Sequence, residues 1–393
     1  MKKKLHLGLL PRILIAIVLG VLFGLFFPEG LVRVFATFNS LFSSFLQFII
    51  PLIIIGLVTP AISDIGKDAG KLLLITALFA YLDTVFSGLL SYATSSTVFP
   101  HLINGSSVGQ EITQFEDVAP YFTIQIPPVM DVMTSLILSF TLGLGMAFFG
   151  SFNLKNVFSE FKDIVVKTIE VVIIPLLPIY IFGIFLGMTH TGQAIEVIKV
   201  FISIIGVIFI LHIVLLVIQY CLAGAVVKRN PFKLLGKMLP AYFTALGTSS
   251  SAATIPVTLE QTKKNGVSDG IAGFTIPLCA TIHLSGSTLK IVACSVALML
   301  MNGMPFDFWM FLGFIMMLGI MMVAAPGVPG GAIMAALGVL SSILGFGDQE
   351  QALMIALYIT MDSFGTACNV TGDGAIALVI DKLFSRRKKD PEA

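Results

Sequence analysis

Residues 238–259 read MLPAYFTALGTSSSAATIPVTL, a run without a charged side chain whose most polar part is its middle. The polar centre, Gly247-Thr248-Ser249-Ser250-Ser251-Ala252, leaves an apolar limb of about ten residues on each side, or about 15 Å of helix. That length is half of the ~30 Å hydrocarbon core of a bilayer. Each limb is too short to cross a membrane, so the stretch is predicted to enter it and turn back as a re-entrant helical hairpin.

A second uncharged stretch, residues 308–347, shows the same pattern. As one straight helix it would be about 60 Å long, so it must fold. The break is predicted at Ala324-Ala325-Pro326-Gly327-Val328-Pro329-Gly330-Gly331, because proline removes a backbone donor and glycine frees the chain. Both tips leave unpaired backbone groups at membrane depth, which only packed protein or a wet cavity tolerates.

The composition indicates a polytopic membrane protein. Of 393 residues, 11% are charged and 56% are hydrophobic, with a mean hydropathy of +0.99, whereas soluble domains carry about 25% charged residues. The net charge of +1 gives no electrostatic case for a nucleic-acid partner. The four cysteines lie in apolar stretches without metal-type spacing, so they are interpreted as small buried hydrophobes and no cofactor is expected.

Full crossings are predicted from nearly uncharged runs long enough to span the bilayer. Together with the two hairpins they predict an all-α polytopic membrane protein with eight transmembrane helices and two re-entrant hairpins. Residues 96–124 are predicted to form an irregular insert that faces water. The runs lie at about 12–27, 34–63, 71–95, 125–150, 165–189 and 198–227, followed by long helices over 269–301, interrupted at Ser285-Gly286-Ser287, and over 349–384.

Lysine and arginine gather at the two ends of the chain, at Lys2-Lys3-Lys4 with Arg12 and at Arg386-Arg387-Lys388-Lys389. By the positive-inside tendency, both termini are predicted to be cytoplasmic in a multi-pass protein of the cell membrane.

A polar stripe marks the last long helix. At 100° per residue, Asp362, Thr366, Asn369 and Asp373 fall at about 0°, 40°, −20° and 20° on one face. A carboxylate inside a membrane helix costs about 2.5–3.5 kcal/mol on insertion scales, so two on one stripe imply partners inside the bundle. A substrate or ion path is favoured, and a purely structural polar seam is the alternative. Repeated hairpins and broken helices are typical of inverted-repeat secondary transporters; two kinked core helices beside ordinary spans remain the simpler alternative.

Three motifs resemble the glutamate/aspartate transporter family, the dicarboxylate/amino acid:cation symporters. Residues 249–258, SSSAATIPVT, resemble the tip of its first hairpin, and residues 327–331, GVPGG, resemble the tip of its second. Residues 362–373 resemble its last helix. The resemblance is dense over 235–385 and collinear from residue 12. It implies a homotrimer in membrane lipid, in which a scaffold holds moving transport domains that carry substrate by an elevator mechanism.

The resemblance also implies a division of the chain into scaffold and transport segments. These are scaffold helices 1 and 2 over 1–68, the third helix of the transport domain over 69–95, an insert with the fourth scaffold helix over 96–164, the fifth scaffold helix over 165–190, the sixth helix of the transport domain over 191–230, the first hairpin over 231–266, the broken seventh helix over 267–303, the second hairpin over 304–347, and the eighth helix with the substrate site over 348–385.

By the same resemblance, Asp362 would bind the amino group of an amino-acid or dicarboxylate substrate, and Asn369 with Thr366 would bind its carboxylate. Backbone groups of the two hairpin tips would close the site, since helix ends present N–H groups to a carboxylate. The substrate-binding set comprises Ser249, Ser250, Ser251, Ser287, Val328, Pro329, Gly330, Asp362, Gly365, Thr366 and Asn369.

The chain differs from the family at the two positions that bind the side-chain carboxylate of acidic substrates. Members that take acidic substrates use an arginine at the position of Ser249 or of Gly365, because a guanidinium suits bidentate carboxylate binding. Neither position supplies one here. A neutral amino acid is therefore predicted as the substrate, with extra room beside Gly365. An acidic amino acid or dicarboxylate, with a cation supplied from elsewhere, is the alternative.

A second departure concerns the coupling ion. The family's Asn-Met-Asp-Gly-Thr run appears here as His283-Leu284-Ser285-Gly286-Ser287, which removes an oxygen ligand that a hard cation prefers. Because histidine titrates near neutral pH, proton coupling through His283 and Asp373 is predicted. Uncoupled transport with a neutral buried His283, and residual sodium coupling, are the alternatives. Asp83 and Lys290 are predicted to form an intramembrane ion pair or otherwise to replace the missing cation.

Two other classes of protein fit the sequence less well. A channel also uses re-entrant hairpins, but its filter repeats polar rings around a pore, whereas the polar groups here form one asymmetric set. An enzyme is not expected, because no metal motif and no Ser/His/Asp set is evident.

Overall fold

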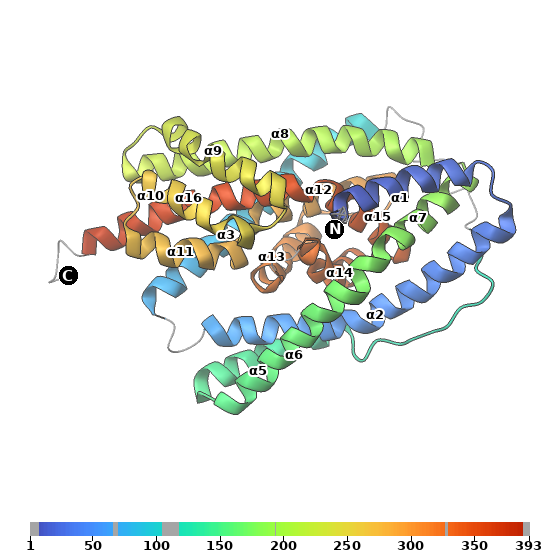
Figure 1. Cartoon of the computed structure of the whole chain (residues 1–393), viewed down its shortest axis with the longest axis horizontal. Coiled ribbons are helices and arrows are strands. Elements are labelled where there is room, and N and C mark those ends of the chain that lie inside the picture. Colours follow the sequence, from blue (N-terminus) through green and yellow to red (C-terminus); the bar gives the residue numbers. More distant parts are fainter. Residues whose placement is uncertain (1–7, 66–69, 104–117, 193, 327–328, 388–393) are drawn as a thin grey trace, which may run out of the picture.

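The computed structural model describes residues 8–65, 70–103, 118–192, 194–326 and 329–387, and these residues form helices and connections without a strand. Figure 1 shows a bundle in which α8 and α16 run along the long axis of the molecule. The helices are α1 (Leu9–Gly24), α2 (Glu29–Ile65), α3 (Lys71–Ile103), α5 (Val132–Phe149), α6 (Phe152–Thr168), η2 (Ile169–Ile173), α7 (Ile174–His190), α8 (Ala194–Val227), α9 (Pro231–Thr248), α10 (Ser251–Lys264), α11 (Asp269–Ile282), α12 (Ser285–Met301), α13 (Phe308–Ala324), α14 (Gly331–Leu344), α15 (Asp348–Thr360) and α16 (Asp362–Arg387).

Among the described residues, six helices are long and apolar enough to cross a membrane, and the bent pair α15–α16 raises the number to seven. The six are α2, α3, α5, α8, the continuous α6–η2–α7 helix and the α11–α12 pair. The first predicted span, α1, has 16 residues, which is shorter than the ~20 residues that cross the hydrocarbon core. The structure therefore shows a polytopic all-α protein with six or seven spans by length and composition.

Helix α3 is longer than the sequence predicts. Residues 96–103 belong to it, so the prediction of an irregular insert from residue 96 is wrong for this part. Phe99 and Ile103 are buried in the core, and burial of their side chains stabilises the last turns of the helix. Residues 104–117, about half of that insert, lie outside the described residues.

The fourth and fifth predicted spans also have different limits. Helix α5 begins at Val132, and α6 continues through the π-helical segment η2 into α7 without a break. The boundary proposed between residues 164 and 165 therefore falls inside a continuous helix. Pro175, at the start of α7, cannot donate a backbone hydrogen bond, which explains why the hydrogen-bond pattern is irregular in the turn before it.

Each hairpin stretch consists of two short helices that pack side by side. Helix α9 ends at Thr248 and α10 begins at Ser251, with Ser249 in the left-handed region at φ 49°. Helices α13 and α14 flank the second tip, where Gly330 has φ 75°. A non-glycine residue with positive φ is strained. Other contacts must therefore stabilise the backbone of the first tip at Ser249.

Both long helices are broken. The first breaks at His283-Leu284, between α11 and α12, so the prediction of a break at residues 285–287 is wrong. Ser285 is already helical, because Asn369 accepts hydrogen bonds at the start of α12. The second long helix bends by 63° at Met361, between α15 and α16, which the sequence analysis missed. The four residues of the polar stripe all lie beyond this bend, on α16.

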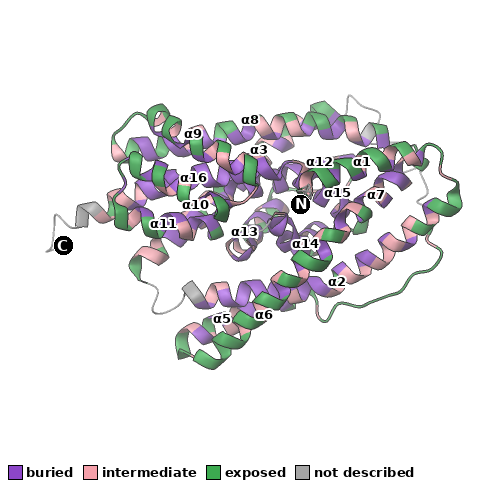
Figure 2. Cartoon of the chain, viewed as in Figure 1, coloured by how far each residue is buried: buried purple, intermediate pink, exposed green. Residues whose placement is uncertain are grey.

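The centre of the bundle is formed by α12 and its neighbours. The α11–α12 pair is the most buried of the candidate spans, with 89% of its most apolar window buried. It contacts α3, α8 and α16, and Figure 2 shows α16 largely buried, whereas α8, at the edge of the bundle, carries many exposed residues. Polar residues on α12 and α16 are therefore shielded from lipid by protein.

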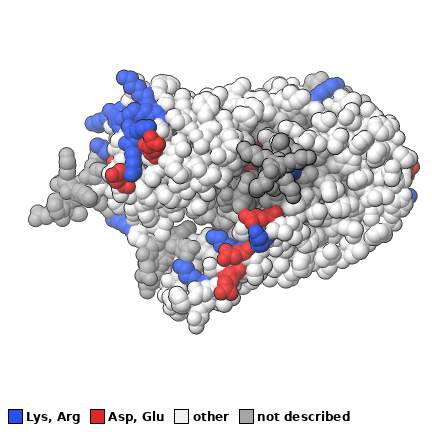
Figure 3. Space-filling model, viewed as in Figure 1, with Lys and Arg blue, Asp and Glu red and all other residues white. Residues whose placement is uncertain are grey.

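Apart from a few buried charges such as Lys290, Asp362 and Asp373, charged side chains lie away from this centre. Figure 3 shows a largely uncharged face, with lysine and arginine gathered at the start of α9 and the end of α10 and with mixed charges along α6. An uncharged belt between charged ends is what the hydrocarbon core requires of a protein surface.

Candidate functional site

A small cavity of about 30 Å³ lies between the two hairpin tips and α16. It has room for a water molecule and is smaller than an amino acid, so a substrate can bind only if a hairpin tip moves. Its lining combines hydroxyls, one amide and one carboxylate with apolar walls. The lining residues are Ser249, Ser251, Ala280, Thr281, Leu284, Ser287, Ala325, Pro326, Ala332, Tyr358, Asp362, Thr366 and Asn369.

Asp362 is the acidic group of this cavity, and both of its oxygens have partners. Oδ1 lies 3.1 Å from Nζ of Lys290 in a buried ion pair, and Oδ2 accepts a hydrogen bond from the backbone N–H of Gly330 at 3.1 Å. The second contact ties the tip of the second hairpin to the start of α16. Asp362 therefore links the lysine behind the cavity with the tip that covers it.

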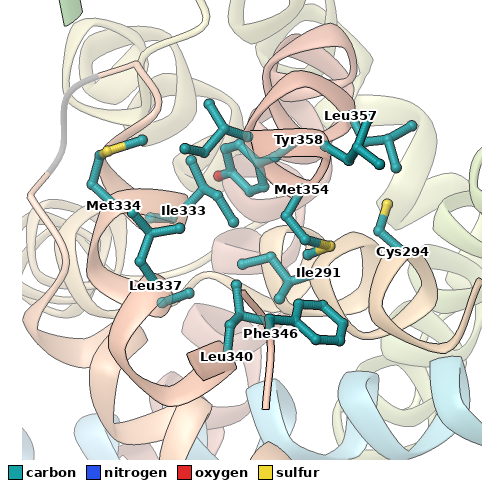
Figure 4. Close-up of a cluster of buried hydrophobic side chains, with 14 of the residues drawn as sticks. Ile291, Cys294, Ile333, Met334, Leu337, Leu340, Phe346, Met354, Leu357 and Tyr358 are labelled. Atoms are coloured by element: carbon teal, nitrogen blue, oxygen red, sulfur yellow. The ribbon is translucent and has the colours of Figure 1, made fainter. Parts of the chain in front are cut away.

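Lys290 is fully buried on α12. Its ammonium lies 3.5 Å from the ring centroid of Tyr358 and donates to the carbonyls of Tyr358 and Met361 at 3.5 and 3.4 Å. Those carbonyls end α15, where the helix dipole favours a cation. Figure 4 shows Tyr358 among apolar side chains of α12, α14 and α15, and Lys290 lies fully buried against its ring.

Lys290 also fills the space beside Gly365. A Cβ atom at Gly365 would lie 2.8 Å from Nζ and 2.9 Å from Cε of the lysine. The prediction of extra room at this position is therefore wrong, and Lys290 is a cation supplied from elsewhere in the chain, which is the condition attached above to an acidic substrate. Lys290 approaches from another helix, a contact that the spacing along one helix cannot predict.

Asn369 closes the start of α12. Its Oδ1 accepts from the N–H groups of Gly286 and Ser287 at 2.8 and 3.3 Å, and its Nδ2 donates to Oγ of Ser287 at 3.2 Å. Tyr358 donates to the same Ser287 hydroxyl at 3.0 Å. An amide has two N–H donors, so Asn369 retains one that can serve a ligand carboxylate in the cavity that it lines.

The remaining predicted substrate residues lie at the hairpin tips and on α16. Ser249 and Ser363 are joined by a 2.7 Å hydrogen bond between their hydroxyls, which fixes the strained tip to α16. Ser250 caps α10 by accepting from the N–H of Ala253, and Ser251 lines the cavity. Thr366 donates its hydroxyl to the carbonyl of Asp362. Pro329 precedes Gly330 in the second tip, and Val328 lies outside the described residues.

A second polar centre lies at the break between α11 and α12. The buried ring of His283 is placed between two carboxylates, with Nδ1 2.8 Å from Oδ1 of Asp373 and Nε2 2.7 Å from Oδ2 of Asp83. Lys290 is paired with Asp362, so the predicted ion pair between Asp83 and Lys290 is wrong. His283 and Lys290 lie on opposite sides of the break between α11 and α12, so each reaches a different carboxylate of α16.

Gln219 on α8 completes this centre, and the sequence analysis missed it. Its Nε2 donates to Oδ2 of Asp83 at 2.6 Å and to Oγ of Ser285 at 3.2 Å. His212, seven residues earlier, contacts the carbonyl oxygen of Gly286 through Nε2 at 3.0 Å. Two polar residues seven apart share one face of a helix, and that spacing in an otherwise apolar span was a signal that could have revealed them.

Asp83 connects the histidine to the outside of the bundle. It lines a separate cavity of about 160 Å³ between α3, α8 and α16, and its side chain is 19% exposed, against 0% for His283 and 1% for Asp373. Over the part of the chain that the structure describes, no group of His, Cys, Asp and Glu is arranged to hold a metal ion. Asp83 is the most exposed of the three titratable groups of this centre.

The two centres share their supports. Helix α16 carries Asp362 and Asn369 at the first centre and Asp373 at the second. The α11–α12 break likewise places Ser287 at the first centre and His283 at the second.

A family model described as the sodium:dicarboxylate symporter family matches residues 9–383. The chain belongs to this family. The resemblance predicted from the two hairpin tips and the last helix is confirmed over nearly the whole chain.

Curated relatives extend over the same length. The chain is 27% identical over 409 aligned positions to the serine/threonine transporter SstT of Acinetobacter baylyi, which covers 96% of this chain and 98% of that protein. It is 29% identical over 349 positions to the serine/threonine transporter SstT of Streptococcus suis, covering 84% and 93%. As a member of the sodium:dicarboxylate symporter family, the chain is a multi-pass membrane transporter and not an enzyme.

The close contact between Gly365 and Lys290 leads to a stability prediction. In Gly365→Ala, the added methyl group would lie too close to the buried lysine, and overpacking of this kind typically costs about 1–3 kcal/mol. We expect a lower thermal midpoint for the purified variant in detergent. Gly313→Ala, on α13, is the matched control, because a Cβ there has no neighbour within 4 Å. Equal midpoints for the two variants would contradict the predicted clash.

Proposed function

We propose that this protein transports a small neutral amino acid together with a proton. The observation that carries the substrate class is the charge of the cavity. Among the described residues that line it, Asp362 is the one acid and none is a base, and Lys290 behind it balances the charge. A neutral zwitterion adds no net charge to this site. The curated relatives are serine/threonine transporters, which supports the same class.

The proposed pose follows from the free groups of the cavity. The substrate ammonium binds Asp362, and its carboxylate binds the second N–H of Asn369 together with the hydroxyl of Ser251 and with that of Thr366, which would turn to the substrate from the Asp362 carbonyl to which it donates in this structure. The serine-rich tip and Thr281 surround a short side chain with hydroxyl groups. A hydroxylated or very small side chain matches this lining better than a long apolar one, because buried hydroxyls need hydrogen-bond partners.

Proton coupling is supported by the two carboxylates on His283. A neutral imidazole has one N–H donor and one acceptor, so it can donate to only one of two carboxylates. The observed contacts at both nitrogens, 2.7 and 2.8 Å long, require one more proton on the ring or on a carboxylate. Loss of that proton would place a nitrogen lone pair against a carboxylate oxygen. The centre therefore binds a proton, and Asp83, the most exposed of its three groups, is the proposed point at which that proton enters.

We further propose the family's mode of transport and assembly. Hairpin stretches α9–α10 and α13–α14, together with the broken helices, form the part that moves as an elevator against a scaffold, within a homotrimer. Both termini are placed in the cytoplasm by the basic residues at the ends of the chain. The cavity that lies between two hairpin tips supports an alternating-access carrier over a channel.

Uptake into proteoliposomes tests the proposal. With separate pH and sodium gradients, radiolabelled serine, threonine and alanine should accumulate when the outside is acidic, and the initial rate should rise as the external pH falls, because protons enter with substrate. A sodium gradient at equal pH should give no accumulation. Uptake driven by sodium alone would contradict proton coupling, equal rates under all gradients would indicate uncoupled transport, and flux that does not saturate would indicate a channel.

One observation favours an acidic substrate as the second candidate. Lys290 supplies a buried cation beside Gly365, close to the place where acidic-substrate members are expected to carry arginine. Thermal-shift measurements with amino acids distinguish the candidates. We expect stabilisation by serine, threonine or alanine and none by aspartate or succinate. Stabilisation by aspartate alone would favour the acidic substrate and contradict the proposed one.

A further inference from the structure

Lys290 has an arrangement that neither substrate binding nor proton coupling explains. A buried lysine costs several kcal/mol unless it is paired, yet it lies directly on the carboxylate proposed to take the substrate ammonium. The distance of 3.1 Å between Nζ and Oδ1 of Asp362 is that of a direct charge-assisted hydrogen bond. The lysine ammonium thus has the same chemistry, and the same partner, as the ammonium of an amino acid.

We propose that Lys290 is a built-in counterion that occupies Asp362 when no amino acid is bound and yields it to the substrate ammonium. This inference rests on the proposed function, because it assumes a substrate with an ammonium group. Without substrate, the ion pair keeps Asp362 neutralised, so the transport segment can return across the membrane without a bound inorganic cation. The lysine therefore neutralises Asp362 during the return step, as a counter-transported cation would.

Lys290 can release Asp362 at low cost because it has other partners in place. Its ammonium already lies on the Tyr358 ring and on the carbonyls of Tyr358 and Met361 at the end of α15. A cation–π contact in a desolvated place and a helix C-terminus each favour a cation. When a substrate ammonium takes Oδ1 of Asp362, these three contacts still hold the lysine, and no buried charge is left alone.

Gly365 and Gly330 make the exchange possible geometrically. The lysine Cε and Nζ occupy the space that a side chain at residue 365 would fill, so only glycine admits the lysine here. Oδ2 of Asp362 holds the Gly330 N–H at the second tip. A change of partner on Oδ1 is therefore transmitted through one carboxylate to the hairpin that must open.

The test separates net transport from exchange. Net uptake requires the substrate-free protein to return, whereas exchange of labelled for unlabelled serine does not. In Lys290→Met, Asp362 is unpaired only when substrate is absent. An unpaired buried charge costs several kcal/mol, so net uptake should fall by about tenfold or more, while exchange stays within a few-fold of the wild type. Serine should also bind more tightly, because its internal competitor is gone.

Two controls sharpen the result. Lys237→Met, which removes a lysine on α9 that donates to the carbonyl of Lys264, should leave both rates unchanged. Methylammonium inside the liposomes should restore net uptake by Lys290→Met, because it supplies the missing ammonium. Equal losses of net uptake and exchange, or no loss of either, would overturn the inference.

A measurement on the wild type keeps the inference testable if the variant does not fold. Net serine uptake should proceed at the same rate with choline, potassium or sodium as the internal cation. A requirement for internal potassium or sodium would overturn the built-in counterion. If wild-type liposomes exchange no serine at all, the proposed function fails instead, so the two failures are distinguishable.

Discussion

Replacement of Asp362 by asparagine is expected to abolish amino-acid transport. The substitution removes the charge that faces the cavity and leaves Lys290 buried without its carboxylate. The substrate ammonium would also lose its carboxylate, and removing one partner of a buried charge pair costs about 3–5 kcal/mol, which corresponds to a loss of more than about a hundredfold in affinity. Serine binding by calorimetry and serine exchange in proteoliposomes would both report this loss.

Asp381→Asn is the matched control for this prediction. Asp381 lies on the same helix and accepts hydrogen bonds from the N–H and hydroxyl of Ser268, far along α16 from the cavity. Its replacement should leave exchange close to the wild-type rate. Because Asp362→Asn can also destabilise the fold, the double variant with Lys290→Met removes the orphaned lysine. The double variant should regain thermal stability and remain unable to bind serine. Serine binding within a few-fold of wild type in Asp362→Asn would contradict the proposed pose.

Replacement of His283 by asparagine is expected to remove proton coupling. In the proposal, the ring between Asp83 and Asp373 holds the transported proton, and the side-chain amide of asparagine cannot take up a proton in its place. Accumulation of serine driven by an acidic exterior should fall to equilibrium in the variant, whereas serine exchange at equal pH should persist. The rise of the wild-type uptake rate between external pH ~8 and ~6 should be absent.

His190→Asn is the control for this experiment, because it makes the same substitution at an exposed histidine at the end of α7. It should retain accumulation and pH dependence. Persistent pH-driven accumulation in His283→Asn would show that the proton is carried elsewhere. Loss of exchange together with accumulation would show that the ring is needed for binding or folding rather than for coupling.

The acidic residues and the histidine of the two sites could be predicted from the sequence, whereas their partners could not. Asp362 and Asp373 stand out because a carboxylate in an apolar helix is costly, and His283 stands out against the family pattern. Their partners come from other helices. Gln219 on α8 binds Asp83 on α3, and Lys290 on α12 binds Asp362 on α16, pairings that depend on where the helices cross.

The breaks between helices limited the prediction in the same way. The serine-rich and proline–glycine stretches locate two tips, since their residues end helices by themselves. The bend of 63° at Met361 has no such residue. The bend coincides with the carbonyls of Tyr358 and Met361, to which Lys290 donates hydrogen bonds. We therefore attribute the bend to a tertiary contact.

The sequence by itself determined that this is an apolar, helical membrane protein. It also located the two hairpin tips and the acidic residues that line the last helix. These features depend on local composition and on the spacing of residues along one chain segment. Only the tertiary structure decided that His283 lies between two carboxylates and that Lys290 occupies Asp362. The physical reason is that a buried charge is stabilised by whichever opposite charge the packing brings within about 3 Å, and residues 72 to 200 positions apart meet only after the helices have packed.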